Sequence, residues 1–310
     1  MKAAIFYGPG QPFTVEEVPT PKPKPGEVLV KVAACGVCHT DLHYTDHNVP
    51  TFKKPPLILG HEASGVVAAV GHDVTGWAEG DRVLLPAVYG CGVCDACRRG
   101  RENICDSMIM FGNNIDGAFA EYIAVSQHTL FALPQELPLV ESCIIADAIT
   151  TPYQAVVNRG QVKPGDVVAV FGCGGIGLNV VQMAAAAGGQ VIAVDVLAQK
   201  LAWAKQMGAE VTIDAGQIER VDKEIRKLSR GGADVTLRIR GRERSGRAES
   251  ISDDAPRIAE GLRKFLMQVP GYARFYDMTL DQDGVPKPED LARAAEEVVM
   301  IEIRLGEPAS

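Results

Sequence analysis

The chain has 310 residues, 46% of them hydrophobic and 23% charged, which is ordinary for a soluble globular protein. Its formal net charge of -8 argues against a nucleic acid or an anionic membrane as partner, because both need a basic surface. The N-terminus lacks a signal-peptide core, and no apolar run is long enough to span a membrane. The eight cysteines are therefore expected as thiols and metal ligands in the cytoplasm.

The first part of the chain, to about residue 130, has the pattern of an all-β domain. Short apolar or alternating runs cover residues 28–32, 65–70 and 82–85, and Gly and Pro separate them. Strands with such frequent turn signals predict a small β-barrel or sandwich. The Pro-rich stretch 18–27 is expected as an extended surface connection.

Two short runs in this part offer half of a catalytic metal site. A thiolate and an imidazole suit zinc, and a metal held by few protein groups keeps a position open for substrate. An isolated Cys or His is more often a buried structural residue, but two clusters beside Gly favour the metal site. The runs CGVCHTDLH and GHE contain Cys38, His39, Thr40, Asp41, His43, His61 and Glu62.

A second metal site is predicted from cysteine spacing alone. The pattern C-x2-C-x2-C-x7-C comprises Cys91, Cys94, Cys97 and Cys105 in a polar loop. Four thiolates at such intervals can close a tetrahedral zinc site that stabilises a loop and does no chemistry. The alternative is four reduced thiols.

Asp147 stands in an apolar, small-residue stretch that is expected to be buried. A buried carboxylate needs a partner, and a metal ion would supply one. The alternative is a helix-capping or otherwise hydrogen-bonded Asp.

The next stretch has the pattern of a dinucleotide-binding unit. An apolar strand over 166–171 leads into G-x-G-x-x-G, followed by a helix over 178–187, a strand over 191–194 and Asp195. The loop brings backbone N–H groups to a pyrophosphate, and Asp195 accepts bonds from a ribose diol, which favours NAD over NADP. The expected cofactor-binding residues are Gly172, Gly174, Gly175, Ile176, Gly177, Asp195 and Lys200, although Lys200 reads equally well as a solvated helix lysine.

The unit then repeats. A helix is predicted over 201–207, a strand over 210–213 and a second helix over 221–228. A fourth strand is expected to begin within 231–235.

With these motifs assembled, residues 1 to about 235 resemble the zinc-dependent medium-chain alcohol dehydrogenases. The shared motifs, in order, are CGVCHTDLH, GHE, the four cysteines, TTPYQA, GCGGIG and Asp195. The resemblance implies an α/β protein with a GroES-like β-barrel catalytic domain and a Rossmann-type doubly wound parallel sheet. It also implies an active site between the two domains and a homodimer or homotetramer. The segments DAITTPYQAV and GNNIDGAFAEY are similar to the branch that oxidises cyclic hydroxyacyl-CoA thioesters.

The resemblance also implies roles for individual residues. Cys38 and His61 are expected as catalytic zinc ligands, and Asp147 occupies the position where many relatives have Cys. Cys143 is the alternative third ligand, and Glu62 is similar to the acidic residue that can enter the coordination shell.

The resemblance implies oxidation of an alcohol by hydride transfer to NAD. Zinc binds the substrate oxygen as a Lewis acid. Thr40 and His43 are expected to relay the proton. His39 is expected near the cofactor pyrophosphate, or is a surface histidine.

The pattern changes after Val235, where a sheet altered beyond residue 236 is expected. Residues 237–247 contain five Arg, which a central strand cannot bury, so this block is predicted as a surface loop or a disordered segment. The strands missing from the family pattern would leave an exposed hydrophobic sheet edge. Helices are expected over 257–269 and 289–297, and a strand over 299–305. The abrupt break favours a change of reading frame or source near residue 236.

The expected organisation is therefore a catalytic domain over 1–150, an NAD-binding domain over 151–250 and an atypical segment over 251–310. The first functional hypothesis is an alcohol dehydrogenase that uses one catalytic zinc, one structural zinc and NAD on a small alcohol or carbonyl compound. The second is a catalytically impaired zinc-binding protein without productive nicotinamide binding. A zinc-free reductase of the same superfamily is disfavoured because both metal motifs are present.

Overall fold

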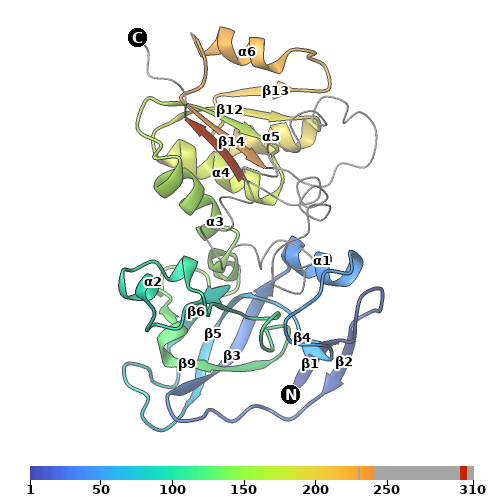
Figure 1. Ribbon diagram of the computed structural model, residues 1–310, viewed down its shortest axis with the longest axis vertical. Helices are drawn as coiled ribbons and strands as arrows, with labels where there is room; N and C mark the ends of the chain where they lie inside the picture. The colour runs from blue at the N-terminus through green and yellow to red at the C-terminus, as the bar shows by residue number, and fades with distance from the viewer. Residues whose placement is uncertain (230, 240–300, 306–310) are drawn as a thin grey trace. The chain divides into compact units, whose positions relative to one another are not determined.

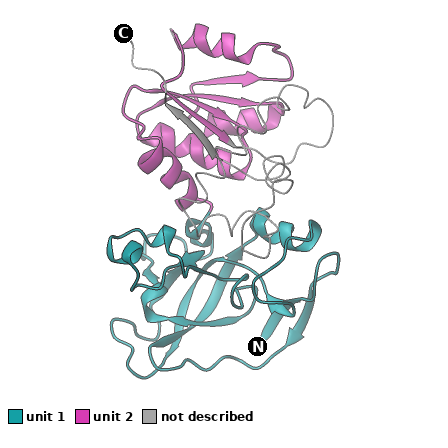
Figure 2. Ribbon diagram, in the orientation of Figure 1, with its two compact units in different colours: residues 1–147, 260–290 teal, residues 148–259, 291–310 magenta. Residues whose placement is uncertain are grey.

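The computed structural model describes residues 1–229, 231–239 and 301–305. These residues form two compact units; Figure 1 labels their helices and strands, and Figure 2 colours the units separately. Residues 1–147 form the first unit, and the second begins at Ala148. Among the described residues, no helix has both the length and the apolar character needed to cross a bilayer.

The first unit is built from antiparallel strands in three sheets. Their orders are β2-β1-β4, β10-β6-β5-β3-β9 and β7-β8. The strands are β1 (Lys2–Phe6), β2 (Thr14–Glu17), β3 (Glu27–Gly36), β4 (Leu57–Ile58), β5 (Glu62–Val70), β6 (Arg82–Leu85), β7 (Val88–Tyr89), β8 (Ile109–Met110), β9 (Tyr122–Ser126) and β10 (Phe131–Ala132). All three runs predicted from apolar patterning are strands, and residues 18–26 form the predicted connection without regular structure.

Alternation of side chains explains how this unit closes. Val28 and Val30 of β3 are fully buried, whereas Lys31 on the same strand is exposed. Their core includes Val67, Val83 and Ile123 from neighbouring strands. A bridge between Ala3 and Ala120 ties the first sheet to the segment that leads into β9, which gives the unit its barrel-like form.

Short helices connect these strands. They are α1 (His39–Asp46), α2 (Asp95–Arg98) and the 3-10 helices η1 (Glu102–Ile104), η2 (Gln127–Thr129) and η3 (Glu141–Ala146). Several residues of the predicted metal motifs lie at their ends: Cys38 precedes α1, Cys94 precedes α2, Cys105 follows η1 and Asp147 follows η3.

The second unit is a twisted sheet with helices on both faces. Its strands are β11 (Val167–Phe171), β12 (Gln190–Asp195), β13 (Val211–Asp214), β14 (Val235–Ile239) and β15 (Ile301–Leu305). Its helices are α3 (Thr150–Tyr153), the π-helix η4 (Gln154–Arg159), α4 (Gly175–Ala186), α5 (Ala198–Gln206) and α6 (Val221–Leu228). The strand order is β13-β12-β11-β14-β15, and the first four strands are parallel.

The two faces of this sheet carry separate cores. Val168 and Val170 of β11 pack with α4 and α5, and Ala169 between them packs with Ile225 of α6. Adjacent residues of a strand point to opposite faces, so a strand covered on both faces must be apolar throughout. The predicted doubly wound parallel arrangement is therefore confirmed, including the helix over 221–228.

One expectation for the region after Val235 is wrong. The predicted surface loop begins inside β14, where Leu237 is fully buried and Arg238 is only partly covered. Successive side chains of a strand point to opposite faces, so Leu237 can be buried while Arg238 is not. β15 pairs antiparallel with β14 and is the last described strand on that side of the sheet.

The predicted strand over 299–305 is confirmed for residues 301–305. The remainder of the Arg-rich block and the helices predicted over 257–269 and 289–297 lie outside the described residues.

Candidate functional site

The CGVCHTDLH run folds as the end of strand β3, a tight connection and helix α1. Cys38 is the residue before α1 and has an extended backbone. The carboxylate of Asp41, three residues on, accepts a hydrogen bond of 3.0 Å from the Cys38 N–H. This bond satisfies a backbone donor at the helix start and fixes the thiol of Cys38 at the edge of the helix.

The GHE run places His61 and Glu62 beside this thiol. Gly60 has a φ of +94°, and a side chain there would lie 2.5 Å from the ring of Phe119. At Gly36 a Cβ would come within 2.2 Å of a Glu62 carboxylate oxygen, so a side chain there would displace that carboxylate. Gly60 thus permits the backbone turn that leads into His61, and Gly36 leaves room for the Glu62 side chain.

Four side chains from three separate segments converge. One ligand atom from each of Cys38, His61, Glu62 and Asp147 lies within 4.8 Å of all the others. Asp147 Oδ2 is 3.8 Å from Cys38 Sγ and 3.6 Å from His61 Nε2. Ligands around a tetrahedral zinc ion are about 3.3–3.8 Å apart, given metal–ligand distances of about 2.0–2.3 Å. The spacing therefore fits a single ion.

His61 provides an independent test of that fit. It is 2% exposed, and neither ring nitrogen has a hydrogen-bond partner among the described residues. Burial lowers the pKa of His61, but Asp147, Asp41 and Cys38 outweigh this effect and raise the pKa well above its ordinary value. A bound cation would be coordinated by this buried imidazole, which has no hydrogen bond among the described residues, and would be attracted by the negative groups around it.

Asp41 has a role that the sequence analysis did not assign. It is 2% exposed, and its Oδ1 lies 3.6 Å from His61 Nδ1 and accepts a hydrogen bond from the Gly60 N–H. Its other oxygen holds Cys38, so one carboxylate orients both ligand segments. The signal in the sequence is an acidic residue three positions after a helix-capping residue.

Asp147 differs from its expected burial. Its side chain is 24% exposed, whereas His61 beside it is buried. Cys143, the alternative third ligand, is buried four residues earlier but is not part of the four-residue group. Burial raises the pKa of Cys143, and Glu62 raises it further.

The remaining predicted residues of the run extend along α1. Thr40 Oγ1 is 3.6 Å from Cys38 Sγ, so its hydroxyl lies beside the four-residue group. His39 is exposed, and its ring centroid is 4.9 Å from that of the half-buried His43. The Nδ1 atoms of His43 and His47 are 3.1 Å apart.

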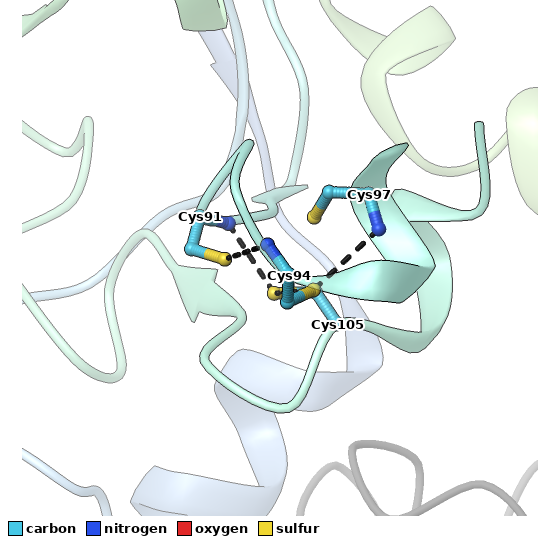
Figure 3. A group of neighbouring side chains, drawn as sticks. All are labelled: Cys91, Cys94, Cys97 and Cys105. Carbon is cyan, nitrogen blue, oxygen red and sulfur yellow. Dashed lines mark hydrogen bonds between the residues drawn. The ribbon is translucent and has the colours of Figure 1, made fainter. Parts of the chain in front are cut away.

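The four cysteines of the second motif form a compact cluster (Figure 3). Their sulfur atoms lie within 4.8 Å of one another, and all four are free thiols. Backbone N–H groups point at the sulfurs: Cys91 and Ser107 donate to Cys105, Cys94 donates to Cys91, and Cys97 donates to Cys94. Such N–H donors stabilise thiolates, which is the state that zinc binds.

The surroundings of this cluster are tight on one side and open on the other. Cys97 and Cys105 are buried, whereas Cys91 is exposed. The N–H groups of Val93 and Cys94 lower the pKa of Cys91 to about 6. Gly90 has no room for a side chain, because a Cβ would lie 2.7 Å from Cys97 Sγ. The cluster accordingly fits a closed tetrathiolate zinc site.

The glycine-rich loop links β11 to α4 as predicted. Gly172 has a φ of +90°, and its N–H donates to the Val194 carbonyl. A Cβ at Gly174 or Gly175 would meet no protein atom within 4 Å. These two glycines are not required by packing, so the space beside the start of α4 suits a ligand phosphate.

Asp195 lies at the end of β12 and is held by the same loop. Its Oδ2 accepts a 2.7 Å hydrogen bond from the Cys173 N–H, and its Oδ1 accepts bonds from Val196 and Leu197. Lys200 lies near enough to lower the pKa of Cys173, although burial of that thiol raises its pKa to about 12. Hydrogen bonds thus hold the Asp195 carboxylate against the glycine-rich loop.

Comparisons with known proteins agree with these features. Residues 24–135 match the family model "Alcohol dehydrogenase GroES-like domain", and residues 175–248 match "Zinc-binding dehydrogenase". An alcohol dehydrogenase from Moraxella sp. (strain TAE123) is 41% identical over 241 residues, which are 76% of this chain and 70% of the relative.

Solved structures give the same result. A crystal structure of an NAD-dependent alcohol dehydrogenase matches with a TM-score of 0.71 and 33% identity, covering 76% of this chain and 69% of that one. A structure of a candidate zinc-binding dehydrogenase from Sinorhizobium meliloti 1021 bound to NADP also has a TM-score of 0.71 and 33% identity, covering 81% and 71%.

The predicted fold, a GroES-like domain followed by a Rossmann-like parallel sheet, is confirmed by these matches. The chain belongs to the zinc-dependent, medium-chain alcohol dehydrogenase family.

Proposed function

We propose that this oxidoreductase transfers hydride from an alcohol to NAD and so forms an aldehyde or ketone. The observation that carries the proposal is the convergence of Cys38, His61, Glu62 and Asp147 within 4.8 Å of one another. A thiolate, an imidazole and carboxylates form a mixed donor set that suits zinc.

In this proposal Cys38, His61 and Asp147 hold the catalytic zinc, and Glu62 is a further carboxylate within reach of it. The ion supplies Lewis acidity, which polarises the substrate hydroxyl and lowers its pKa. Asp41 keeps the His61 ring oriented through Nδ1. The protein residues thus fix a site that can be held by three ligands and leave room for a substrate oxygen.

Thr40 and His43 are the proposed proton-handling residues. The Thr40 hydroxyl lies 3.6 Å from Cys38 Sγ, where it can accept the proton that the alcohol loses. His43 is three residues further along α1 and therefore on the same side of the helix. Its imidazole is the proposed next proton acceptor, and His39, at the exposed start of α1, is proposed to contact cofactor phosphate.

The cofactor is proposed to bind at the loop before α4. Gly172, Gly174, Gly175, Ile176 and Gly177 would present backbone N–H groups to the pyrophosphate, and a bound nicotinamide would supply the hydride acceptor. Asp195 supports NAD over NADP because its charge repels a 2′-phosphate, and Lys200 is proposed to lie near the ribose.

The four cysteines are proposed to hold a structural zinc. Their donor set is closed, so it offers no position to a substrate. The compartment is proposed to be the cytoplasm, where eight free cysteines remain reduced. A homodimer or homotetramer is the proposed assembly.

Turnover with zinc-replete protein tests the activity. NAD and a panel of alcohols are added, and reduced nicotinamide is followed by absorbance. The matched variants are Gly174→Val, which fills the open space in the loop, and Gly216→Val after β13, which adds the same side chain outside it. We expect NAD reduction that only Gly174→Val weakens; no reduction with any alcohol would overturn the proposal.

One observation favours a second candidate, a zinc-binding protein without turnover. Among the described residues, four parallel strands are followed at one edge of the sheet by the antiparallel strand β15. If this edge prevents productive nicotinamide binding, the protein would hold two zinc ions per chain but reduce no NAD. Metal analysis combined with the turnover assay separates the two candidates.

A further inference from the structure

The histidines of α1 form a group apart from the four-residue metal cluster. His43 and His47 are four residues apart, so they lie on one face of the helix. Their Nδ1 atoms are 3.1 Å apart and their ring centroids 5.2 Å apart. Both side chains are half-buried.

The backbone fixes this pair. His47 caps the C-terminal end of α1, and its N–H donates to the His43 carbonyl at 3.2 Å. The same carbonyl accepts a bond from the Val49 N–H. The two imidazoles therefore stand on a closed helical turn, at the end of the helix whose dipole favours positive charge.

The distance between the two Nδ1 atoms is compatible with two arrangements. One proton between the atoms gives an N–H···N hydrogen bond between neutral rings. One metal ion can replace that proton, since two nitrogens at about 2.0–2.1 Å from an ion and 90–110° apart are about 2.8–3.4 Å from each other. The observed 3.1 Å lies within that range.

We propose that His43 and His47 form a second, chelating site for a divalent transition-metal ion, separate from both cysteine-containing clusters. Two imidazole nitrogens suit Ni²⁺, Cu²⁺ or Zn²⁺, and water completes the coordination. The ligand is a labile ion, because two protein donors hold it instead of four.

Occupancy of this site would inhibit turnover. This consequence rests on the proposed function, in which His43 accepts a proton. A metal ion on Nδ1 leaves the ring proton on Nε2 and gives the ring a positive charge, so neither nitrogen of His43 has a lone pair left to take up the proton.

The binding experiment uses untagged, zinc-replete full-length protein. Ni²⁺ is the probe because imidazoles bind it well, whereas thiolate-rich sites favour zinc. Equilibrium dialysis measures bound Ni²⁺, and zinc analysis of the same sample confirms that zinc stays in place. Wild type is compared with His47→Gln, with His43→Gln and with the control His72→Gln, whose exposed ring pairs with Asp73 outside α1.

We expect one equivalent of Ni²⁺ that His47→Gln and His43→Gln each bind about 100-fold more weakly, because the chelate becomes a single donor. His72→Gln should bind as wild type. Wild-type affinity in both α1 variants, or loss of the equivalent in His72→Gln alone, would overturn the site. Unchanged zinc content shows that a variant has folded.

Inhibition is measured against each protein's own metal-free rate. Ni²⁺ should inhibit wild type and His72→Gln but spare His47→Gln. Binding without inhibition would remove His43 from the proposed proton path and leave the chelate standing. If the protein has no turnover at all, the proposed function fails, but the dialysis result still decides the metal site.

Discussion

The two clusters of potential metal ligands in the first unit differ in composition and in how the chain assembles them. The four-cysteine cluster is uniform, and backbone N–H groups donate to three of its sulfurs. The cluster around His61 is mixed, and the ring nitrogens of that histidine have no hydrogen-bond partner among the described residues. One cluster is stabilised by its own loop; the other is assembled from distant segments.

The origin of the ligands, from one loop or from three segments, indicates which role each cluster is suited to. The cysteines all come from one 15-residue loop, Cys91 to Cys105, so a metal there closes a local structure. The mixed cluster joins the start of α1, the start of β5 and the end of η3, and Cys38, His61 and Asp147 are its proposed ligands. Because it can leave one position open, it is suited to catalysis.

Replacing Cys38 should have the largest effect, because it should remove the function of one cluster and leave the other intact. In Cys38→Ala the mixed cluster loses its thiolate, and we expect kcat/KM to fall by at least about a thousandfold, since Lewis acidity supplies several kcal/mol to the transition state. Zinc analysis should fall from two ions per chain to one. Cys35→Ala is the control, because this thiol lies outside the group. Loss of both ions, or full activity, would show that the two clusters are not independent.

Replacing Asp147 tests whether its carboxylate is a ligand. Asp147→Asn keeps the shape but removes the charge, so we expect weaker zinc retention and a loss of about 100-fold in kcat/KM. Asp147→Cys should retain zinc, because a thiolate is an equally good ligand.

Cys143→Ala distinguishes the alternative ligand. It should leave zinc content and kcat/KM near wild type, because Cys143 is outside the group. A loss of zinc in Cys143→Ala with none in Asp147→Asn would instead assign Cys143 as the ligand.

A smaller effect is expected from Asp41, which touches the ligands and not the substrate. Asp41→Asn should lower zinc affinity by about tenfold, as loss of an orienting carboxylate does at other metal sites. Competition with a chelator measures this affinity apart from turnover. Asp46→Asn, on the exposed side of the same helix, is the control. Equal zinc affinity in both variants would mean that Asp41 only caps α1.

Local spacing explains which parts of these sites the sequence could predict. The interval pattern of Cys91 to Cys105 contains the whole cluster, and the loop after β11 contains its own glycines. The role of Asp41 was missed because it depends on Gly60 and His61, which are 19 and 20 residues away in the sequence. A contact between segments leaves no periodic signal in either one.

The start of the Arg-rich block was mispredicted for a related reason. A row of arginines argues against a buried strand when residues are counted together, yet only alternate side chains of a strand face one core. Leu237 satisfies that core, and the pairing of β14 with β15 joins residues more than sixty positions apart. Composition cannot report such a long-range pairing.

The smallest effect on catalysis is expected from the four-cysteine cluster. In Cys105→Ser the cluster loses a fully buried thiol that accepts bonds from the Cys91 and Ser107 N–H groups. Zinc should fall by one ion per chain, while kcat/KM per remaining folded protein changes by no more than about threefold, because no substrate position is altered.

Loss of zinc from the four-cysteine cluster should make the loop sensitive to proteolysis. Without zinc, the chain around Arg98, Arg99 and Arg101 opens, and trypsin should cleave there well before it cleaves wild type. Cys38→Ala provides the mirror control, since it loses the other ion and should keep this loop resistant. If Cys105→Ser stays resistant, or Cys38→Ala becomes equally sensitive, then zinc in the loop does not hold it closed and the two clusters do not divide structure from catalysis.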